Sequence, residues 1–287
     1  MTNNNDAAAA FAAAAPYLPK LYRLDDAAAG AEAPLGHTIA ESDPSWRIAN
    51  IRAMFGRTHA RLHLLPEYRK PKESPLAIVA GGPSLESEFT RLRSFDTVMV
   101  CGSAHDYLVG RGIRPRYAVL FDPAPAAAEY LTRAIDGTTY LVASSCAGEI
   151  FDALRFRAVA VWHAMDQEIP EAEYRGEPSV EGGGFALLRG IVLGLLLGYR
   201  VQHIFGADCS YGPIRTHAYA SYDPPPARIR LAVGAPDGPA FDTSLLLMAQ
   251  AQQFAFHRHH FRSLLRTIVH GEGLLAAMIN SQGKENA

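Results

Sequence analysis

The sequence predicts an α/β protein built on a doubly wound, mostly parallel sheet with helices on both faces. From residue 76 onward, short apolar runs alternate with amphipathic segments of helical spacing. The apolar runs are nearly continuous, which is typical of strands that are buried on both faces of a sheet. Six such runs with helices between them indicate parallel strands joined by helical crossovers.

Three regions are expected along the chain of 287 residues. Residues 1–40 are rich in alanine and poor in large apolar side chains, which predicts a loose or disordered segment. Residues 41–75 form a helical lead-in, because apolar residues recur at helical spacing between Pro44 and Gly56. Residues 76–287 form the sheet domain, which is Rossmann-like in its pattern of strands and helices.

The strands and helices of this domain are expected in alternation. The predicted strands are LAIVA, TVMVCG, YAVLFD, TYLVASS, AVAVWHAM and VQHIFGAD. The helices between them are SLESEFTRLRSF, AHDYLVGRG, APAAAEYLTRAI, AGEIFDALRF and GFALLRGIVLGLLLG. Residues 208–243 are rich in Pro, Gly, Asp and Tyr, and we expect a long loop there. A long C-terminal helix over 244–266 and a short strand with a turn over 267–278 complete the domain.

Composition excludes several classes of protein. The chain has 27 basic and 29 acidic residues, so it lacks the basic surplus of nucleic-acid-binding domains. Its three cysteines, Cys101, Cys146 and Cys209, are far apart, which argues against a zinc site and a disulfide framework and fits a reducing cytoplasm. No signal peptide is evident, and the most apolar stretch, 190–199, is much shorter than the roughly 20 residues of a membrane helix. We therefore expect a cytoplasmic protein whose partners include neither nucleic acid nor a membrane.

Candidate site residues follow the predicted strands directly, because ligands of open α/β sheets lie beyond the carboxyl ends of the strands. This position selects Gly81, Gly82, Pro83, Ser84, Gly102, Ser103, Asp122, Ser144, Ser145, His163, Gly206 and Asp208.

The turn from Gly81 to Ser84 has two interpretations. Its glycines permit close backbone approach to a ligand, and the N–H groups of the following helix could hold a phosphate. Alternatively, Ser84 is only the cap of a strand-to-helix corner. The stretch is neither GxGxxG nor a Walker A loop, which disfavours a nicotinamide dehydrogenase and a P-loop kinase.

Two aspartates end predicted strands and are candidate Mg²⁺ ligands. Asp122 and Asp208 would lie at one sheet edge, and Mg²⁺ bound to phosphates takes one or two carboxylates as ligands. A ribose hydroxyl is an alternative partner for Asp122. A helix cap and a turn residue are the purely structural alternatives for the two positions.

Further candidates lie in loops and in the C-terminal helix. The glycines 182–184 lead into a helix and could contact phosphate or substrate, or could serve only as a hinge. Arg215 could hold a phosphate and His217 could act as a general base, although both also fit a solvated loop. A basic helix face is favoured over a metal site for His257, His259 and His260.

The order of these segments resembles the 6-hydroxymethylpterin diphosphokinase (MptE-like) family, whose domain is shared with the motility-associated factors that glycosylate flagellin. The residues that carry the resemblance are Gly82–Leu85, Gly102–Ser103, Ile113, Pro115, Asp122, Gly182–Gly184, Gly206 and Asp208. They span about half of the chain. Ala80 stands where the family pattern has its first glycine, and Glu181 and Phe185 flank the second glycine region, where many relatives have a small hydroxyl residue.

The resemblance implies a nucleotide-dependent transferase that uses Mg²⁺ and ATP and moves diphosphate to a small-molecule acceptor such as a pterin. It implies that Asp122 and Asp208 bind Mg²⁺, that the Gly82–Ser84 turn binds phosphates, and that His217 or Arg215 acts on the transferred group. Two alternatives stay open at this point. One is a glycosyltransferase that uses a nucleotide-activated sugar, such as a CMP-linked nonulosonate, and the other is a binding scaffold without turnover.

Overall fold

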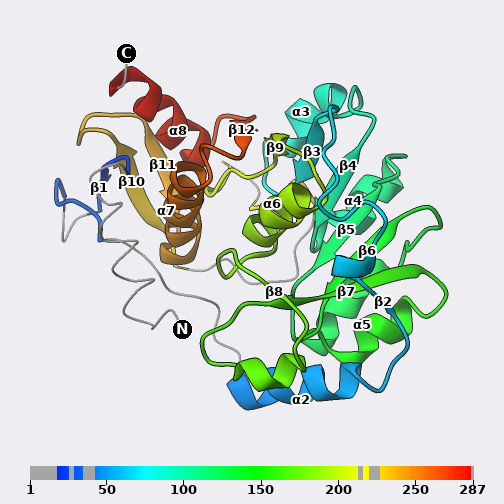
Figure 1. The fold of residues 1–287 in the computed structure, drawn as a ribbon. Coiled ribbons are helices and arrows are strands. Elements are labelled where there is room, and N and C mark those ends of the chain that lie inside the picture. The colour runs from blue at the N-terminus through cyan, green and yellow to red at the C-terminus, as the bar shows by residue number, and fades with distance from the viewer. Residues whose placement is uncertain (1–17, 26–28, 35–42, 213–215, 220–226, 286–287) are drawn as a thin grey trace. The chain divides into compact units, whose positions relative to one another are not determined.

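The structure is a computed structural model that describes residues 18–25, 29–34, 43–212, 216–219 and 227–285. The chain divides into two compact units (Figure 1). The sheet unit consists of Ala40–Ala80 and Arg93–Gln202, and the C-terminal unit consists of Met1–Ile39, Gly81–Leu92 and His203–Ala287.

The sheet unit contains a parallel sheet, as the sequence predicts. Its strands are β2 (Ala60–Arg61), β3 (Leu76–Val79), β4 (Val98–Cys101), β5 (Tyr117–Leu120), β6 (Thr139–Ala143) and β7 (Ala158–Ala164). They lie in the order β3-β4-β5-β6-β7-β2, and each neighbouring pair is parallel. The short strand β8 (Ser179–Val180) also pairs with β7 in parallel. Strands β3, β4 and β5 are buried along their whole length, which explains their nearly continuous apolar sequences.

Helices cover both faces of this sheet. Between successive strands run α4 (Ala104–Gly110), the 3-10 helix η3 (Pro125–Leu131) and α5 (Gly148–Ala153). Right-handed crossovers between strands that advance in one direction place these three on the same face. Helix α6 (Ala186–Leu196) crosses the other face over β3, β4 and β5 (Figure 1). The doubly wound fold class predicted from the sequence is therefore confirmed.

The remaining helices of the sheet unit are short. The predicted helix at Pro44 is present as α2 (Pro44–Met54), and the Asp43 carboxylate caps it by accepting the Ser45 N–H at 2.8 Å. Two further 3-10 turns are η2 (Leu62–Leu64) and η4 (Glu171–Tyr174).

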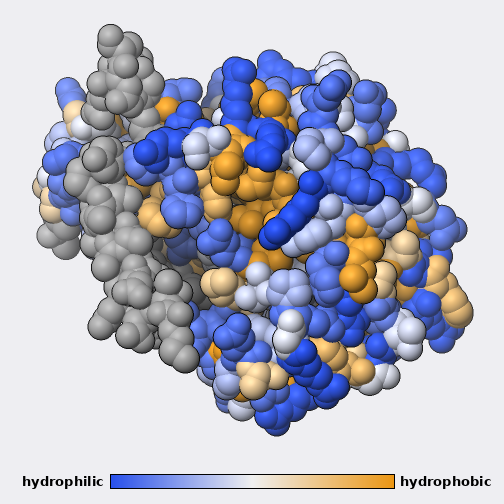
Figure 2. Space-filling view, viewed as in Figure 1, coloured by the Kyte–Doolittle hydropathy of each residue, from blue (hydrophilic) through white to orange (hydrophobic). Residues whose placement is uncertain are grey.

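Hydrophobic side chains gather over α6 in Figure 2, whereas most of the visible surface elsewhere is hydrophilic.

The C-terminal unit combines helices with a small antiparallel sheet. It contains α3 (Leu85–Leu92), most of β9 (Val201–Phe205), α7 (Leu245–His260), β12 (Arg266–Val269) and α8 (Leu274–Glu285). The antiparallel sheet has the order β1 (Leu21–Arg23), β10 (Ile229–Val233) and β11 (Ala240–Thr243). The predicted long C-terminal helix is present as α7, and the Ser244 hydroxyl caps it by accepting the Leu247 N–H at 3.2 Å.

Three expectations about local structure are wrong. The segment 208–243, predicted as a loop, contains the β10–β11 hairpin, in which Leu231, Ala232 and Val233 are buried ahead of a Pro- and Gly-containing turn. The segment 267–278 continues past its strand into the helix α8. The helix expected over APAAAEYLTRAI is the 3-10 helix η3, and the residues that follow it are held by side chains from outside the segment.

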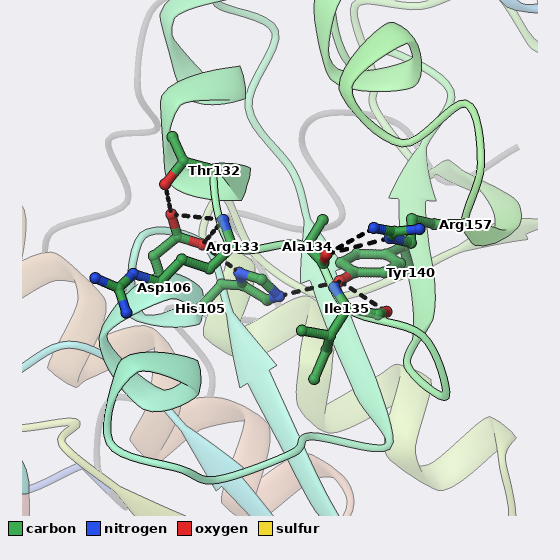
Figure 3. Close-up of polar contacts among 8 residues, drawn as sticks. All are labelled: His105, Asp106, Thr132, Arg133, Ala134, Ile135, Tyr140 and Arg157. Atoms are coloured by element: carbon green, nitrogen blue, oxygen red, sulfur yellow. Dashed lines mark hydrogen bonds and ion pairs between the residues drawn. The ribbon is translucent and has the colours of Figure 1, made fainter.

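Those side chains form a polar network between α4 and β6 (Figure 3). Buried His105 lies between Asp106 and Tyr140, with Nδ1 at 2.7 Å from Asp106 Oδ1 and Nε2 at 3.2 Å from the Tyr140 hydroxyl. The Tyr140 hydroxyl accepts the Ile135 N–H at 2.8 Å. Asp106 accepts hydrogen bonds from the Thr132 hydroxyl and the Arg133 N–H. The chain after η3 is thereby fixed to α4 and β6.

Helices of membrane-spanning length and apolarity are not found among the residues that the structure describes.

We predict that Tyr140→Phe lowers the free energy of unfolding by about 1–3 kcal/mol, because it leaves the buried His105 Nε2 and the half-buried Ile135 N–H without their partner. Urea denaturation followed by circular dichroism measures this change. Thr132→Val, which removes an exposed donor from the same network, serves as the matched control and should cost less than about 1 kcal/mol. Equal costs for the two variants would contradict a central role for the buried hydroxyl.

Candidate functional site

The predicted glycine turn and the predicted Asp208 meet in the C-terminal unit. The Ser84 N–H donates to Asp208 Oδ2 at 3.1 Å, and the Gly82 N–H donates to the Gly206 carbonyl at 2.7 Å. Asp208 is 5% exposed, so its carboxylate is enclosed at the amino end of α3. A helix amino end favours a negative charge, and here the chain itself supplies that charge.

The two glycines of the turn are required by contacts within the chain. A Cβ atom on Gly82 would lie 2.1 Å from Asp208 Oδ2 and 2.6 Å from the Gly206 carbonyl oxygen. A Cβ atom on Gly81 would lie 2.2 Å from the Tyr219 hydroxyl oxygen. Both distances are far below van der Waals contact, so the close approach of Asp208 and Tyr219 explains the doublet without a ligand.

The segment before α8 forms another side of the same site. The Asp208 carbonyl accepts the Leu275 N–H at 3.1 Å, and the Ser210 hydroxyl accepts the Leu274 N–H at 3.1 Å. The backbone at Gly271 packs against the Ser84 side chain. The residues around Asp208 therefore join the amino ends of two helices, α3 and α8.

The Ser84 hydroxyl is a candidate ligand contact. Its oxygen is buried and makes no hydrogen bond of ordinary geometry with any described residue, although it lies close enough to Asp208 to lower the pKa of that carboxyl. A buried hydroxyl without such a bond needs an explanation, and either an ordered water or a ligand would supply a partner.

Burial dominates the electrostatics of Asp208. It raises the pKa of the Asp208 carboxyl above its ordinary value, and the Ser84 side chain and amide oppose this rise only in part. An ionised carboxylate at this position is destabilised unless it gains a further partner. A cation is the chemical group that would relieve this cost most directly.

Residues 216–219 bring a predicted histidine close to the turn. The Ala218 N–H donates to the Gly81 carbonyl at 3.0 Å, and the rings of His217 and Tyr219 lie 5.5 Å apart between centroids. The predicted Arg215 lies outside the described residues. Tyr219 was not selected from the sequence, because nothing in a loop rich in aromatic residues distinguishes it before its contact with Gly81 is known.

A pair of stacked histidines supports the segment that packs on Ser84. His203 Nδ1 lies 2.8 Å from His270 Nε2, and Arg91 Nη1 lies 3.0 Å from His270 Nδ1. The His270 ring also stacks on Phe205, with centroids 4.4 Å apart. Burial, His203 and Arg91 together lower the pKa of His270 to about 4. His270 is therefore neutral near pH 7, and it directly precedes Gly271.

The predicted candidates at the strand ends of the sheet unit are in turns. Gly102 has a φ of 56°, and its N–H donates to the Val119 carbonyl at 2.9 Å. Ser103 occupies the cap position of α4 but makes no side-chain capping bond. Asp122 Oδ1 accepts the Ala124 N–H at 2.9 Å, two residues along the chain, although the cap residue of η3 is Ala124 and this helix has no side-chain capping bond. The structure thus gives Asp122 a local hydrogen bond at the start of η3.

The second glycine region lies over a buried arginine. Gly182 has a φ of 129° and packs against Arg189 and Val192, and Gly183 and Gly184 continue to the start of α6. Arg189 is 6% exposed. Its guanidinium donates to the carbonyls of Val180 at 2.5 Å and Met165 at 2.9 Å. The guanidinium therefore ties the end of β8 to the residue that follows β7.

Ser144 and His163 form a buried network. His163 Nδ1 lies 2.8 Å from Ser144 Oγ, and His163 Nε2 lies 3.1 Å from Glu177 Oε2. Arg61 pairs with Glu177 at 2.8 Å. The pair has the residue types of a nucleophile and its base. Both side chains are only 1% exposed, however, so a substrate could not reach them.

The candidates Ser145, His257 and His260 contact other parts of the protein. The neighbouring Ser145 carbonyl accepts a hydrogen bond from Asn50 Nδ2 at 2.9 Å. The rings of His257 and His260 contact aromatic neighbours at the end of α7, which include Phe261.

No group of three or more His, Cys, Asp or Glu side chains is placed to bind a metal ion within the described part of the chain. This does not conflict with a magnesium–nucleotide complex, because Mg²⁺ often takes only one or two carboxylates and completes its shell with water and phosphate oxygens. Asp208 could supply one such carboxylate, because the Ser84 N–H uses only its Oδ2 and leaves Oδ1 for a cation.

Comparisons with known proteins give a family and a fold. The model of the family described as "6-hydroxymethylpterin diphosphokinase MptE-like" matches residues 48–213, which is more than half of the chain. The solved MAf glycosyltransferase from Magnetospirillum magneticum AMB-1 is similar over 83% of this chain, with 18% identity and a TM-score of 0.56. The similar region is 38% of that protein, so this chain corresponds to well under half of its length.

A mammalian sialyltransferase is similar over 80% of this chain and 81% of its own, at 9% identity and a TM-score of 0.40. None of the curated proteins matches the chain in sequence.

We predict that Gly82→Ala destabilises the protein by about 1–3 kcal/mol, because the added methyl group would overlap the Asp208 carboxylate. Urea denaturation measures the change. Gly56→Ala is the matched control, since its Cβ would meet only the Ala53 carbonyl oxygen at 3.3 Å. Gly82→Ala should cost less in an Asp208→Ala background, and strict additivity of the two changes would contradict the proposed contact.

We also predict that stability decreases as the pH falls from about 6.5 toward about 4, because folded His270 binds a proton less readily than a histidine of the unfolded chain. The stabilisation is fully present above the unfolded pKa and is lost toward the folded one. His270→Phe keeps an aromatic ring on Phe205 and removes the titration. Its unfolding free energy, measured in urea across this range, should vary less with pH, and an unchanged slope would contradict the assignment.

Proposed function

Because the chain belongs to the 6-hydroxymethylpterin diphosphokinase MptE-like family, we propose that it is a nucleotide-dependent transferase that moves diphosphate from ATP to a hydroxymethyl group of a small acceptor such as a pterin. The observation that carries this proposal is the extent of the family match. The matched residues 48–213 include the Gly81–Ser84 turn, Asp122 and Asp208. The names of the family and of the solved neighbour both denote transferases, which supports the reaction class.

The reaction would be an in-line displacement at phosphorus. The acceptor oxygen forms a bond to the β-phosphorus of ATP, the bond from that phosphorus to the oxygen bridging the α-phosphate breaks, and AMP leaves. The acceptor hydroxyl loses its proton in this step. We assign the proton to His217, since an imidazole titrates near neutral pH and the His217 segment is hydrogen-bonded to the turn through Ala218.

The residues around the turn have separate proposed roles. Asp208 would hold Mg²⁺, and the bound ion would neutralise phosphate charge. The buried Ser84 hydroxyl is the proposed donor to a phosphate oxygen, because it has no hydrogen bond of ordinary geometry within the described chain. Gly102, Ser103 and the glycines 182–184 remain proposed nucleotide contacts in the sheet unit. There, Asp122 is proposed to bind a ribose hydroxyl or a metal ion.

Sugar transfer from a nucleotide-activated donor is the second candidate function. It is favoured by the structural similarity to the MAf glycosyltransferase, which extends over 83% of the chain and hence beyond the family match. In that reaction an acceptor hydroxyl would attack the anomeric carbon of a sugar, and a nucleotide such as CMP would leave. The released nucleotide distinguishes the two reactions.

We predict that the protein releases AMP from ATP in the presence of Mg²⁺ and 6-hydroxymethylpterin, and that EDTA abolishes the release. Chromatography of the nucleotides measures the product. Asp208→Asn should lower the rate roughly 100-fold by removing charge where it is needed, with Asp122→Asn tested in parallel. Asp136→Asn is the control, since Asp136 is 86% exposed in its side chain and lies outside the proposed site.

Full turnover by a folded Asp208→Asn variant would remove the metal-binding role. Release of CMP from a CMP-linked sugar, without release of AMP from ATP, would replace the first function by the second. Release of neither nucleotide would favour a binding scaffold.

A further inference from the structure

The sheet unit carries a pocket of about 450 Å³ at the amino-terminal edge of its sheet. Thr97 and Arg116 line it and directly precede β4 and β5, and Lys72 lies shortly before β3. In a parallel sheet all amino ends meet at one edge, so this pocket lies at the edge opposite to Gly102 and Asp122. It therefore has no part in the site proposed above.

One side of the pocket is fixed by the backbone. The Arg69 N–H donates to the Leu196 carbonyl at 2.6 Å, and the Lys72 N–H donates to the Gly198 carbonyl at 2.9 Å. A Cβ atom on Gly198 would lie 1.8 Å from the Lys70 carbonyl oxygen, so this close approach requires glycine. The segment that carries both lysines is thus held against the end of α6, and the pocket is formed before any ligand binds.

The charges in the pocket favour an anion. Lys70, Lys72 and Arg116 line it against Glu67 and Asp96, which leaves one positive charge in excess. Glu67 is already engaged, because its Oε1 lies 3.7 Å from the Arg116 guanidinium and accepts the Tyr117 hydroxyl at 3.4 Å. Neither lysine forms an ion pair with another residue of the described ranges, and both ammonium groups are available to a ligand.

Two tyrosines line the pocket and expose only a small part of their surface. Tyr117 and Tyr199 are 2% and 5% exposed, and their rings meet edge to face with centroids 6.3 Å apart. Burial and the neighbouring Tyr199 raise the pKa of the Tyr117 phenol, so it stays a neutral group near pH 7. A neutral aromatic wall beside ammonium groups suits a ligand with a carbon skeleton and a charged end.

We propose that this pocket is a second ligand site, which binds a small phosphate monoester such as a sugar phosphate. Lys70 and Lys72 contact the phosphate, and the Tyr117–Tyr199 pair contacts the carbon skeleton. The volume lies within the range of about 300–1,000 Å³ that is usual for small-molecule sites. A doubly charged phosphate matches two unpaired ammonium groups better than a single carboxylate does.

The test uses ribose 5-phosphate as the probe and isothermal titration calorimetry on the full chain. We expect saturable binding of ribose 5-phosphate, none of ribose, and weakening as the salt concentration rises. The Lys70→Gln/Lys72→Gln variant should bind roughly tenfold more weakly or worse, because charge-assisted hydrogen bonds are lost. Lys70→Arg/Lys72→Arg, which keeps both charges, should retain most of the binding.

Two matched controls locate the site. Lys20→Gln removes a surface lysine of the C-terminal unit and should leave binding unchanged. Asp208→Asn should also leave it unchanged, so failure of the proposed transferase function would not affect this result. Absence of saturable binding, equal binding of succinate, or equal affinity of Lys70→Gln/Lys72→Gln and the wild type would overturn the proposal.

Discussion

The enclosed carboxylate of Asp208 is the constraint on which the candidate site depends. It accepts the Ser84 N–H, it leaves no room for a side chain on Gly82, and its own carbonyl accepts the Leu275 N–H. One residue thus orients the amino ends of α3 and α8. Burial raises the pKa of this carboxyl and makes its charge costly, whereas the Ser84 contacts that fix the turn offset that cost only in part. In our proposal, a bound cation offsets the remaining cost of this charge.

This geometry changes the meaning of the glycine turn. From its residues the turn was either a corner or a phosphate cradle, and the contacts of Gly82 with Asp208 and of Gly81 with Tyr219 account for both glycines within the chain. Two groups remain for a ligand. They are the buried Ser84 hydroxyl and the carboxylate oxygen of Asp208 that does not accept the Ser84 N–H. The turn therefore serves a nucleotide indirectly in our proposal, by placing a carboxylate and a hydroxyl together rather than by wrapping a phosphate.

The parallel strands could be predicted because each one is a short, continuous apolar run, and a local pattern is enough to identify it. The approach of Asp208 to the glycine turn could also be predicted from the sequence, because both follow strands and strand ends define where ligands bind in such sheets. The roles of Tyr219 and Gly271 could not be predicted from the sequence, since they depend on contacts with residues more than a hundred positions away in the chain. The β10–β11 hairpin was missed because its turn residues and prolines suggested a loop, although Leu231 and Val233 are buried. The pocket at Lys70 and Lys72 could not be predicted in this way, because it lies at the amino ends of the strands, opposite to the ends where ligands of such sheets bind.

The most direct test of the central claim is a measurement of the Asp208 carboxyl pKa by carbon-13 NMR, with the resonance assigned from Asp208→Asn. The account predicts a pKa above the ordinary value of about 3.9 in the free protein, and a clear decrease when Mg²⁺ and a nucleotide are added together. A pKa at the ordinary value, or one that does not respond to Mg²⁺ and nucleotide, would contradict the assignment of Asp208 as the buried carboxylate that binds the cation.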